Sequence, residues 1–190
     1  IFTPKTAETV GYIFYPGGHV DARSYSLYAR DIARQGYLVV VPEMPLSLAV
    51  LGINRANEII DNHPQIRQWS IGGHSLGGAM ACSYIASNPG KVHGLVLLAA
   101  YPASGTDVSD SGLRVASLVG TQDTVVNRNS LESGRALLPD STQYVTLEGG
   151  NHGQFGSYGI QPGDTPNPSM SAADQRKNAV METIAVLKGK

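Results

Sequence analysis

The stretch around Ser75 constrains the fold more than any other part of the chain. A short apolar run at 69–71 ends at Gly73-His74-Ser75-Leu76-Gly77, and apolar residues then recur at four-residue spacing. This order predicts a strand, a tight turn and a helix. A G-x-S-x-G turn exposes its Ser hydroxyl on strained backbone at a helix N-terminus, which favours a developing negative charge. We therefore expect Ser75 to be a nucleophile for acyl transfer; the alternative is a plain turn before a buried helix.

Length and charge narrow the class of protein. The 190 residues fit one domain, 1–190, with a substantial core. Lys plus Arg number 14 and Asp plus Glu 15, so no basic excess would attract phosphates, and we expect no nucleic-acid partner. Cys82 is the only cysteine, which excludes an internal disulfide and a Cys-based zinc site. We expect Cys82 to be a small buried residue of the helix after Ser75.

No apolar run is long enough to span a membrane, and no signal-peptide pattern opens the chain. The first residues, Ile1-Phe2, are typical of the middle of a strand, so we expect that an upstream segment was removed. The sequence leaves a cytoplasmic and an exported location both open, and it does not indicate an oligomeric state.

Apolar runs alternate with helical patterns along the whole chain. We expect strands at 10–15, 37–41, 69–71, 93–100, 114–120 and 143–147, and helices at 21–36, 47–62, 129–138 and from 171 onward, besides the helix after Ser75. Continuous apolar strands that alternate with helices indicate an α/β fold, a mostly parallel sheet of about six strands with helices on both faces. Active groups should then lie in loops at the carboxyl ends of the strands.

A serine nucleophile needs a histidine base. Of the five histidines, only His152 follows the last predicted strand, in the glycine-rich loop Gly149-Gly150-Asn151-His152-Gly153. Because that loop lies at the carboxyl end of a strand, we expect His152 to take the proton from Ser75. A residue that merely turns the chain is the alternative for His152.

The base needs a carboxylate to orient it. Asp123 directly follows the fifth predicted strand, in Gly120-Thr121-Gln122-Asp123, and can reach the neighbouring histidine loop. We expect it to hold the tautomer of His152 and to stabilise its charged form. Asp107 and Asp110, in the polar loop after the fourth strand, are rivals, although such residues more often turn the chain.

An oxyanion hole needs two backbone donors. The N–H of Leu76, next to the nucleophile, is expected to supply one. The second should come from the loop Pro16-Gly17-Gly18-His19, where we favour Gly18 over His19 because its backbone can approach closely. A phosphate-binding role for Gly17-Gly18 is disfavoured, since no Lys-Ser/Thr follows.

These motifs, with Gly150-Asn151-His152-Gly153-Gln154-Phe155-Gly156, resemble the small α/β-hydrolases of the dienelactone-hydrolase-like group over nearly all of the chain. The resemblance implies an α/β-hydrolase fold, a Ser75–Asp123–His152 triad in the family's order, oxyanion donors at Gly18 and Leu76, and no cofactor or metal. Two features depart from the group. Dienelactone hydrolases have Cys at the position of Ser75, and the first antiparallel strands of the superfamily are truncated or missing here.

Many relatives insert a helical cap after the fourth strand, but 101–113 is too short for one, so we expect an open cleft and small, soluble substrates. The loops at 43–46 and 154–158 are expected to line it, with His19, Met44 and Phe155 as substrate contacts; packing around the triad is their alternative role.

The sequence thus favours a serine hydrolase that cleaves carboxylic esters through an acyl-enzyme. The same triad serves amidases, thioesterases and acyltransferases. A ligand-binding protein that keeps the fold without activity is the alternative from a different class.

Overall fold

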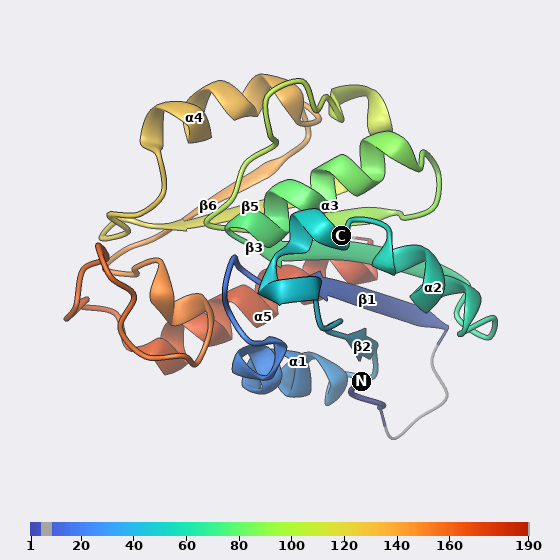
Figure 1. The fold of residues 1–190 in the computed structure, drawn as a ribbon, viewed down its shortest axis with the longest axis horizontal. Helices are drawn as coiled ribbons and strands as arrows, with labels where there is room; N and C mark the ends of the chain where they lie inside the picture. The colour runs from blue at the N-terminus through green and yellow to red at the C-terminus, as the bar shows by residue number, and fades with distance from the viewer. Residues whose placement is uncertain (5–8, 190) are drawn as a thin grey trace.

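In the part of the chain described by a computed structural model, residues 1–4 and 9–189, six strands form one sheet (Figure 1). They are β1 (Val10–Tyr15), β2 (Leu38–Val40), β3 (Gln68–His74), β4 (Gly94–Leu98), β5 (Arg114–Gly120) and β6 (Gln143–Leu147). All neighbouring pairs are parallel, in the order β2-β1-β3-β4-β5-β6. The predicted parallel sheet of about six strands is confirmed.

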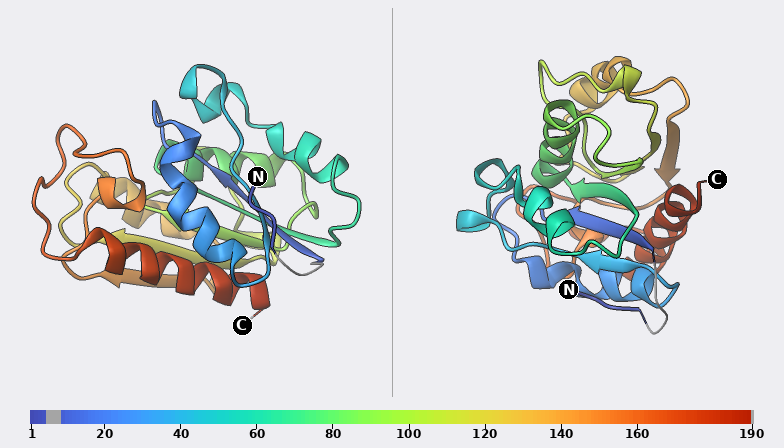
Figure 2. Two further views of the ribbon diagram at one scale, coloured as in Figure 1. Left: turned by 90° about the horizontal axis from the view of Figure 1, so that it is seen from below. Right: turned by 90° about the vertical axis from the view of Figure 1, so that its right-hand side faces the viewer.

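Helices cover both faces of this sheet. They are α1 (Ser26–Ala33), α2 (Arg55–Asp61), α3 (Leu76–Ser87), α4 (Arg128–Ser133) and α5 (Ala172–Lys188), with the 3₁₀ helices η1 (Ala22–Tyr25), η2 (Pro45–Ser47), η3 (Ala49–Leu51), η4 (Ser109–Ser111), η5 (Gly134–Leu137) and η6 (Gly153–Phe155). α1 and α5 lie on one face, and α2, α3 and α4 lie on the other (Figures 1 and 2).

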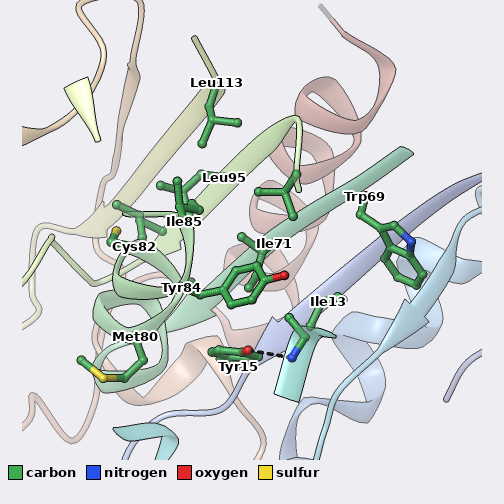
Figure 3. Packing of buried hydrophobic residues seen from close by; sticks show 14 of the residues in the cluster. Ile13, Tyr15, Trp69, Ile71, Met80, Cys82, Tyr84, Ile85, Leu95 and Leu113 are labelled. Carbon is green, nitrogen blue, oxygen red and sulfur yellow. Dashed lines mark hydrogen bonds between the residues drawn. The ribbon is translucent and has the colours of Figure 1, made fainter. Parts of the chain in front are cut away.

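Side chains that alternate along each strand supply a core to each face. In β1, Ile13 and Tyr15 point into the core under α2 and α3, while Tyr12 and Phe14 point into the core under α1 and α5. Figure 3 shows the first core, in which the aliphatic residues of the strands meet Tyr84 and its neighbours on α3. Both faces of the sheet are therefore shielded from water, which explains why the strands are continuous apolar runs.

Several predicted boundaries shift in the structure. The helix expected at 47–62 is replaced by η2, η3 and α2, because Leu46 and Ser47 have φ of 52° and 55° and interrupt helical geometry. The helix expected at 129–138 divides into α4 and η5 at Gly134. Strand β4 ends at Leu98 because Ala99 has φ of 47°. The predicted start of α5 is confirmed, since the Ser171 hydroxyl accepts the Asp174 N–H.

The first residues and the connection between β4 and β5 add little to the sheet. Phe2 forms an antiparallel bridge with Val39, which is the extent of antiparallel pairing that residues 1–4 show. Between β4 and β5, residues 101–113 contain one short 3₁₀ helix, η4, and no cap. None of the helices in the described residues is long and apolar enough to cross a bilayer.

The sheet order fixes where a ligand can bind. β1 lies between β2 and β3, and the chain passes from β1 to β2 on one side before it crosses back to β3 on the other. The order in which strands are added to the sheet therefore reverses between β1 and β3. A crevice opens at such a switch point, outside the carboxyl ends of the strands. The loop with Gly17 and Gly18 follows β1, and Ser75 follows β3.

Candidate active site

Ser75 lies in a strained turn between β3 and α3. Its φ of 52° and ψ of −122° are rare for a residue with a side chain. The flanking glycines are required by close backbone contact: a Cβ at Gly73 would collide with the backbone of Gly77, and a Cβ at Gly77 would collide with the carbonyl of Tyr15. The G-x-S-x-G pattern therefore reflects a real constraint of space.

His152 and Asp123 are joined directly. Nδ1 of His152 lies 2.8 Å from Oδ2 of Asp123, and both side chains are buried. The other carboxylate oxygen, Oδ1, accepts the N–H groups of Val125 at 2.9 Å and Val126 at 2.8 Å. The carboxylate is thus held on both oxygens, and this fixes the orientation of the imidazole.

The environment of Asp123 keeps it charged. Burial acts to raise the pKa of its carboxyl, but the hydrogen bond and charge of His152, with the N–H groups of Val126 and Val125, outweigh burial and lower the pKa. Asp123 is therefore a carboxylate near neutral pH, as required of a group that stabilises an imidazolium.

The second nitrogen of His152 is buried without a partner. Nε2 makes no hydrogen bond to any described residue. His152 and Ser75 line the same cavity, and the structure has no hydrogen bond between them. An unpaired buried ring nitrogen is costly unless a ligand or a moved side chain satisfies it. Ser75 and a histidine with one unpaired ring nitrogen thus line one cavity.

Two backbone donors remain free beside Ser75. The N–H of Leu76 opens α3, where intrahelical partners do not exist. The N–H of His19 is taken by the carbonyl of Ser47 at 2.8 Å, whereas the N–H of Gly18 has no partner among the described residues. Gly18 also approaches Leu76 closely: a Cβ there would lie 3.2 Å from its side chain. Of the loop's two candidates, Gly18 is the one with an available N–H.

A buried polar network links this loop to the turn. The Tyr25 hydroxyl accepts the Gly17 N–H at 3.0 Å and is hydrogen-bonded to Nδ1 of His74 at 2.8 Å. Burial first, and the nearby His152 second, hold the pKa of His74 well below its usual value, although the backbone of His152 opposes this. His74 is therefore a neutral ring. The sequence did not predict that Tyr25 links the loop after β1 to His74, because Tyr25 is one of many aromatic residues.

The cavity at Ser75 has a volume of about 370 Å³ and a mostly apolar wall. Besides Ser75 and His152, its wall comes from α3, from the segment after β4 and from the loop after Asp123: Leu76, Ala79, Met80, Ala99, Ala100, Tyr101, Ala103, Val125, Val126 and Asn127. Sequence position could have identified two of these residues, because Tyr101 closely follows β4 and Val125 lies two residues after Asp123.

The three predicted substrate contacts do not line this cavity. His19 is exposed in the loop after β1, with φ of 58°. Met44 is buried in the core under α2 and α3, and Phe155 is buried in the core under α1 and α5, 5.7 Å from the ring of His74. Met44 and Phe155 thus take the alternative role of packing.

The rival acids lie elsewhere. Asp107, just before η4, and Asp110, within it, are exposed and line a separate cavity with the end of α3. Asp107 accepts the N–H of Ser109 at 2.9 Å, so it turns the chain. Neither residue contacts His152.

Comparisons with solved structures show the same fold. The chain superposes on Est1E from Butyrivibrio proteoclasticus, solved with ferulic acid bound, with a TM-score of 0.74, 11% identity, and coverage of 98% of this chain and 93% of that one. For a dienelactone hydrolase from Anabaena variabilis the TM-score is 0.70, with 16% identity and coverage of 97% and 89%. For an uncharacterized protein from Bacillus cereus it is 0.69, with 14% identity, 97% of this chain and 61% of that one.

No curated protein matches the chain in sequence. The model of the alpha/beta hydrolase family, in contrast, matches residues 11–177, which include the loops that carry Ser75, Asp123 and His152 and all of the sheet except Val10. The chain belongs to the alpha/beta hydrolase family.

Proposed function

We propose that this chain is a serine hydrolase that cleaves carboxylic esters of small, uncharged acyl groups. Ser75 is the nucleophile, His152 the base and Asp123 the residue that orients the base. The observation that carries the proposal is the state of His152: one ring nitrogen is bound to a carboxylate, the other has no partner among the described residues, and His152 lines a cavity together with Ser75.

In the first half of the reaction, Oγ of Ser75 attacks the ester carbonyl carbon while Nε2 of His152 takes the hydroxyl proton. The carbonyl oxygen becomes negative and is held by the N–H groups of Gly18 and Leu76. The intermediate then collapses: the alkoxide leaves, and the imidazolium returns the proton to it as the alcohol departs. Asp123 stabilises the imidazolium throughout.

In the second half, a water molecule takes the place of the alcohol. His152 accepts one of its protons as the oxygen attacks the acyl carbon, and a second tetrahedral intermediate forms. When the carbon–Oγ bond breaks, the proton on His152 passes to Ser75, and the carboxylic acid is released. The free enzyme is regenerated, so the cycle needs no cofactor.

The wall of the cavity supports the choice of acyl group. Leu76, Ala79, Tyr101, Ala103 and Val126 are all uncharged, and no Lys or Arg is among the lining residues. A carboxylate on the acyl group would lose its hydration there without gaining a cationic partner. A small aliphatic or aromatic acyl group gains from burial instead.

The test compares the wild type with Ser75→Ala on a short p-nitrophenyl ester, with labelling by a fluorophosphonate probe. We expect the wild type to hydrolyse the ester and to carry the label on Ser75, and Ser75→Ala to lose both. Loss of a triad member costs on the order of a million-fold in turnover. Ser87→Ala, at the exposed end of α3, is the matched control and should retain activity. A folded wild type with no turnover and no label would overturn the proposal.

A further inference from the structure

A segment far from the triad in sequence ties the acid loop to the base loop. Residues 163–165 lie in the long connection between η6 and α5, which passes beside the loop after β5 (Figures 1 and 2). Thr165 Oγ1 donates to the carbonyl of Gln122 at 2.6 Å, and the Thr165 carbonyl accepts from Asn151 Nδ2 at 2.8 Å. The segment therefore contacts the residue before Asp123 and the residue before His152.

Asp164, at the centre of this segment, contacts the residues after them. Its Oδ2 accepts the N–H of Gly153 at 2.8 Å, and its Oδ1 accepts the N–H of Thr124 at 3.3 Å. One carboxylate thus bridges the backbone directly after His152 and directly after Asp123. Those two partners are 11 and 40 residues away along the chain.

This carboxylate has an unusual environment for a loop residue. Asp164 is only 8% exposed, and no cationic side chain pairs with it in the described part of the chain. A buried carboxylate without a cation is costly, and backbone N–H groups are the donors that offset this cost here. A residue that only turned the chain would not need both oxygens, because a single acceptor or a glycine suffices for a turn.

The bridge acts on the geometry that the proposed reaction needs. The 2.8 Å contact between His152 and Asp123 depends on how far apart their two loops stand. The far side of the base loop is fixed separately, because the fully buried Gln175 side chain on α5 binds both backbone groups of Asn151. Before the two catalytic residues the loops are joined directly, because the Gln122 N–H donates to the Gly150 carbonyl at 2.8 Å. Asp164 supplies the link on the other side, after His152 and after Asp123.

We propose that Asp164 is a positioning residue that sets the distance between His152 and Asp123; this inference rests on the proposed function. Asp164 makes no contact with the reacting atoms and acts through the two loops. Its loss should lower turnover more than it weakens substrate binding, because the ester binds in a cavity to which Asp164 does not contribute.

The test uses Asp164→Asn. An Asn side chain has one oxygen and one NH₂ group, so whichever way it lies, one of the two N–H groups loses its acceptor. Asp107→Asn is the matched control, since Asp107 also accepts a backbone N–H but lies at the exposed η4. For wild type and both variants, kcat and KM are measured on the p-nitrophenyl ester, and the NMR signal of the His152 Nδ1 proton is recorded.

We expect Asp164→Asn to lower kcat by about 100-fold with KM within about twofold, as for a small misplacement of catalytic groups. The Nδ1 proton signal should move or broaden in Asp164→Asn and stay unchanged in Asp107→Asn. If Asp164→Asn does not fold, Thr165→Val, which removes only the bond to Gln122, must show the same two changes at smaller size.

Unchanged kcat and an unchanged Nδ1 signal in a folded Asp164→Asn variant would overturn the inference. Failure of the proposed function is a different result: the wild type then has no ester turnover, yet the Nδ1 signal still decides whether Asp164 positions His152.

Discussion

The imidazole rings of His74 and His152 pack against each other, with 4.6 Å between their centroids and 48° between their planes. His74 precedes Ser75 in sequence, so the turn that carries Ser75 also supports the ring of His152. The Tyr25 hydroxyl extends the contact to the loop after β1 through Gly17. The turn that carries Ser75, the ring of His152 and the loop after β1 are therefore held together by one buried network.

Tyr25→Phe should separate activity from stability in this network. The change leaves the Gly17 N–H and Nδ1 of His74 without a partner, which costs about 1–3 kcal/mol in the free energy of unfolding. We expect kcat to fall about tenfold, less than the roughly 100-fold or greater loss from deletion of an oxyanion donor. Urea unfolding and ester kinetics measure the two effects.

Tyr28→Phe is the control for that change. The Tyr28 hydroxyl is buried on the same face and bonds Tyr12 and Thr183, away from the cavity. Tyr28→Phe should lower the free energy of unfolding by a similar amount and leave kcat unchanged. Equal losses of kcat in both variants would show that the network at Tyr25 has no special link to the site.

The backbone at Ser75 predicts a gain in stability when the side chain is removed completely. With φ of 52° and ψ of −122°, a residue with a Cβ is strained by on the order of 1–3 kcal/mol, while Gly is not. Gly loses about 0.5–1 kcal/mol through its greater unfolded-state entropy. Ser75→Gly should therefore be about 1 kcal/mol more stable than Ser75→Ala in thermal unfolding, and both should be inactive. An Ala variant at least as stable as the Gly variant would contradict the strain.

The lowered pKa of Asp123 predicts a pH dependence of stability. An unfolded Asp has a pKa of about 3.9, and the folded value is lower. The stability that Asp123 contributes is then fully present above about pH 4 and is lost as the pH falls through the folded value. In urea titrations, the difference between wild type and Asp123→Asn should be constant from about pH 7 to pH 5 and shrink below pH 4. A difference that grows on acidification would reverse the assigned direction.

The sequence predicted which of the proposed site residues lie at the carboxyl ends of strands. A parallel sheet brings the loops after its strands to the same edge, so the order of Ser75 after β3, Asp123 after β5 and His152 after β6 predicted that all three lie at that edge. Gly73 and Gly77 also marked the turn in the sequence, because two backbone segments touch at each of them and leave no room for a Cβ.

The wall of the cavity was harder to predict. Met44 and Phe155 lie in loops that were expected to line the cleft, but tertiary packing turns both side chains into the cores. Ala79 and Tyr101 line the cavity because α3 and the segment after β4 pass each other there. Asp164 gives no local signal, since its partners come from two other loops. Contacts between distant segments leave no periodicity to detect.

Ala79→Leu should shorten the acyl chain that the enzyme accepts. Ala79 lies on α3, one turn after Ser75, and lines the cavity. The larger side chain fills space needed by a longer acyl group, and one methylene in an apolar pocket is worth about 10- to 200-fold in specificity. Over a series of p-nitrophenyl esters, we expect kcat/KM for the hexanoate to fall at least about tenfold relative to the acetate. Ala86→Leu, on the same helix but exposed and outside this cavity, should leave the ratio unchanged. A parallel loss for all chain lengths in Ala79→Leu would mean that the acyl group binds elsewhere.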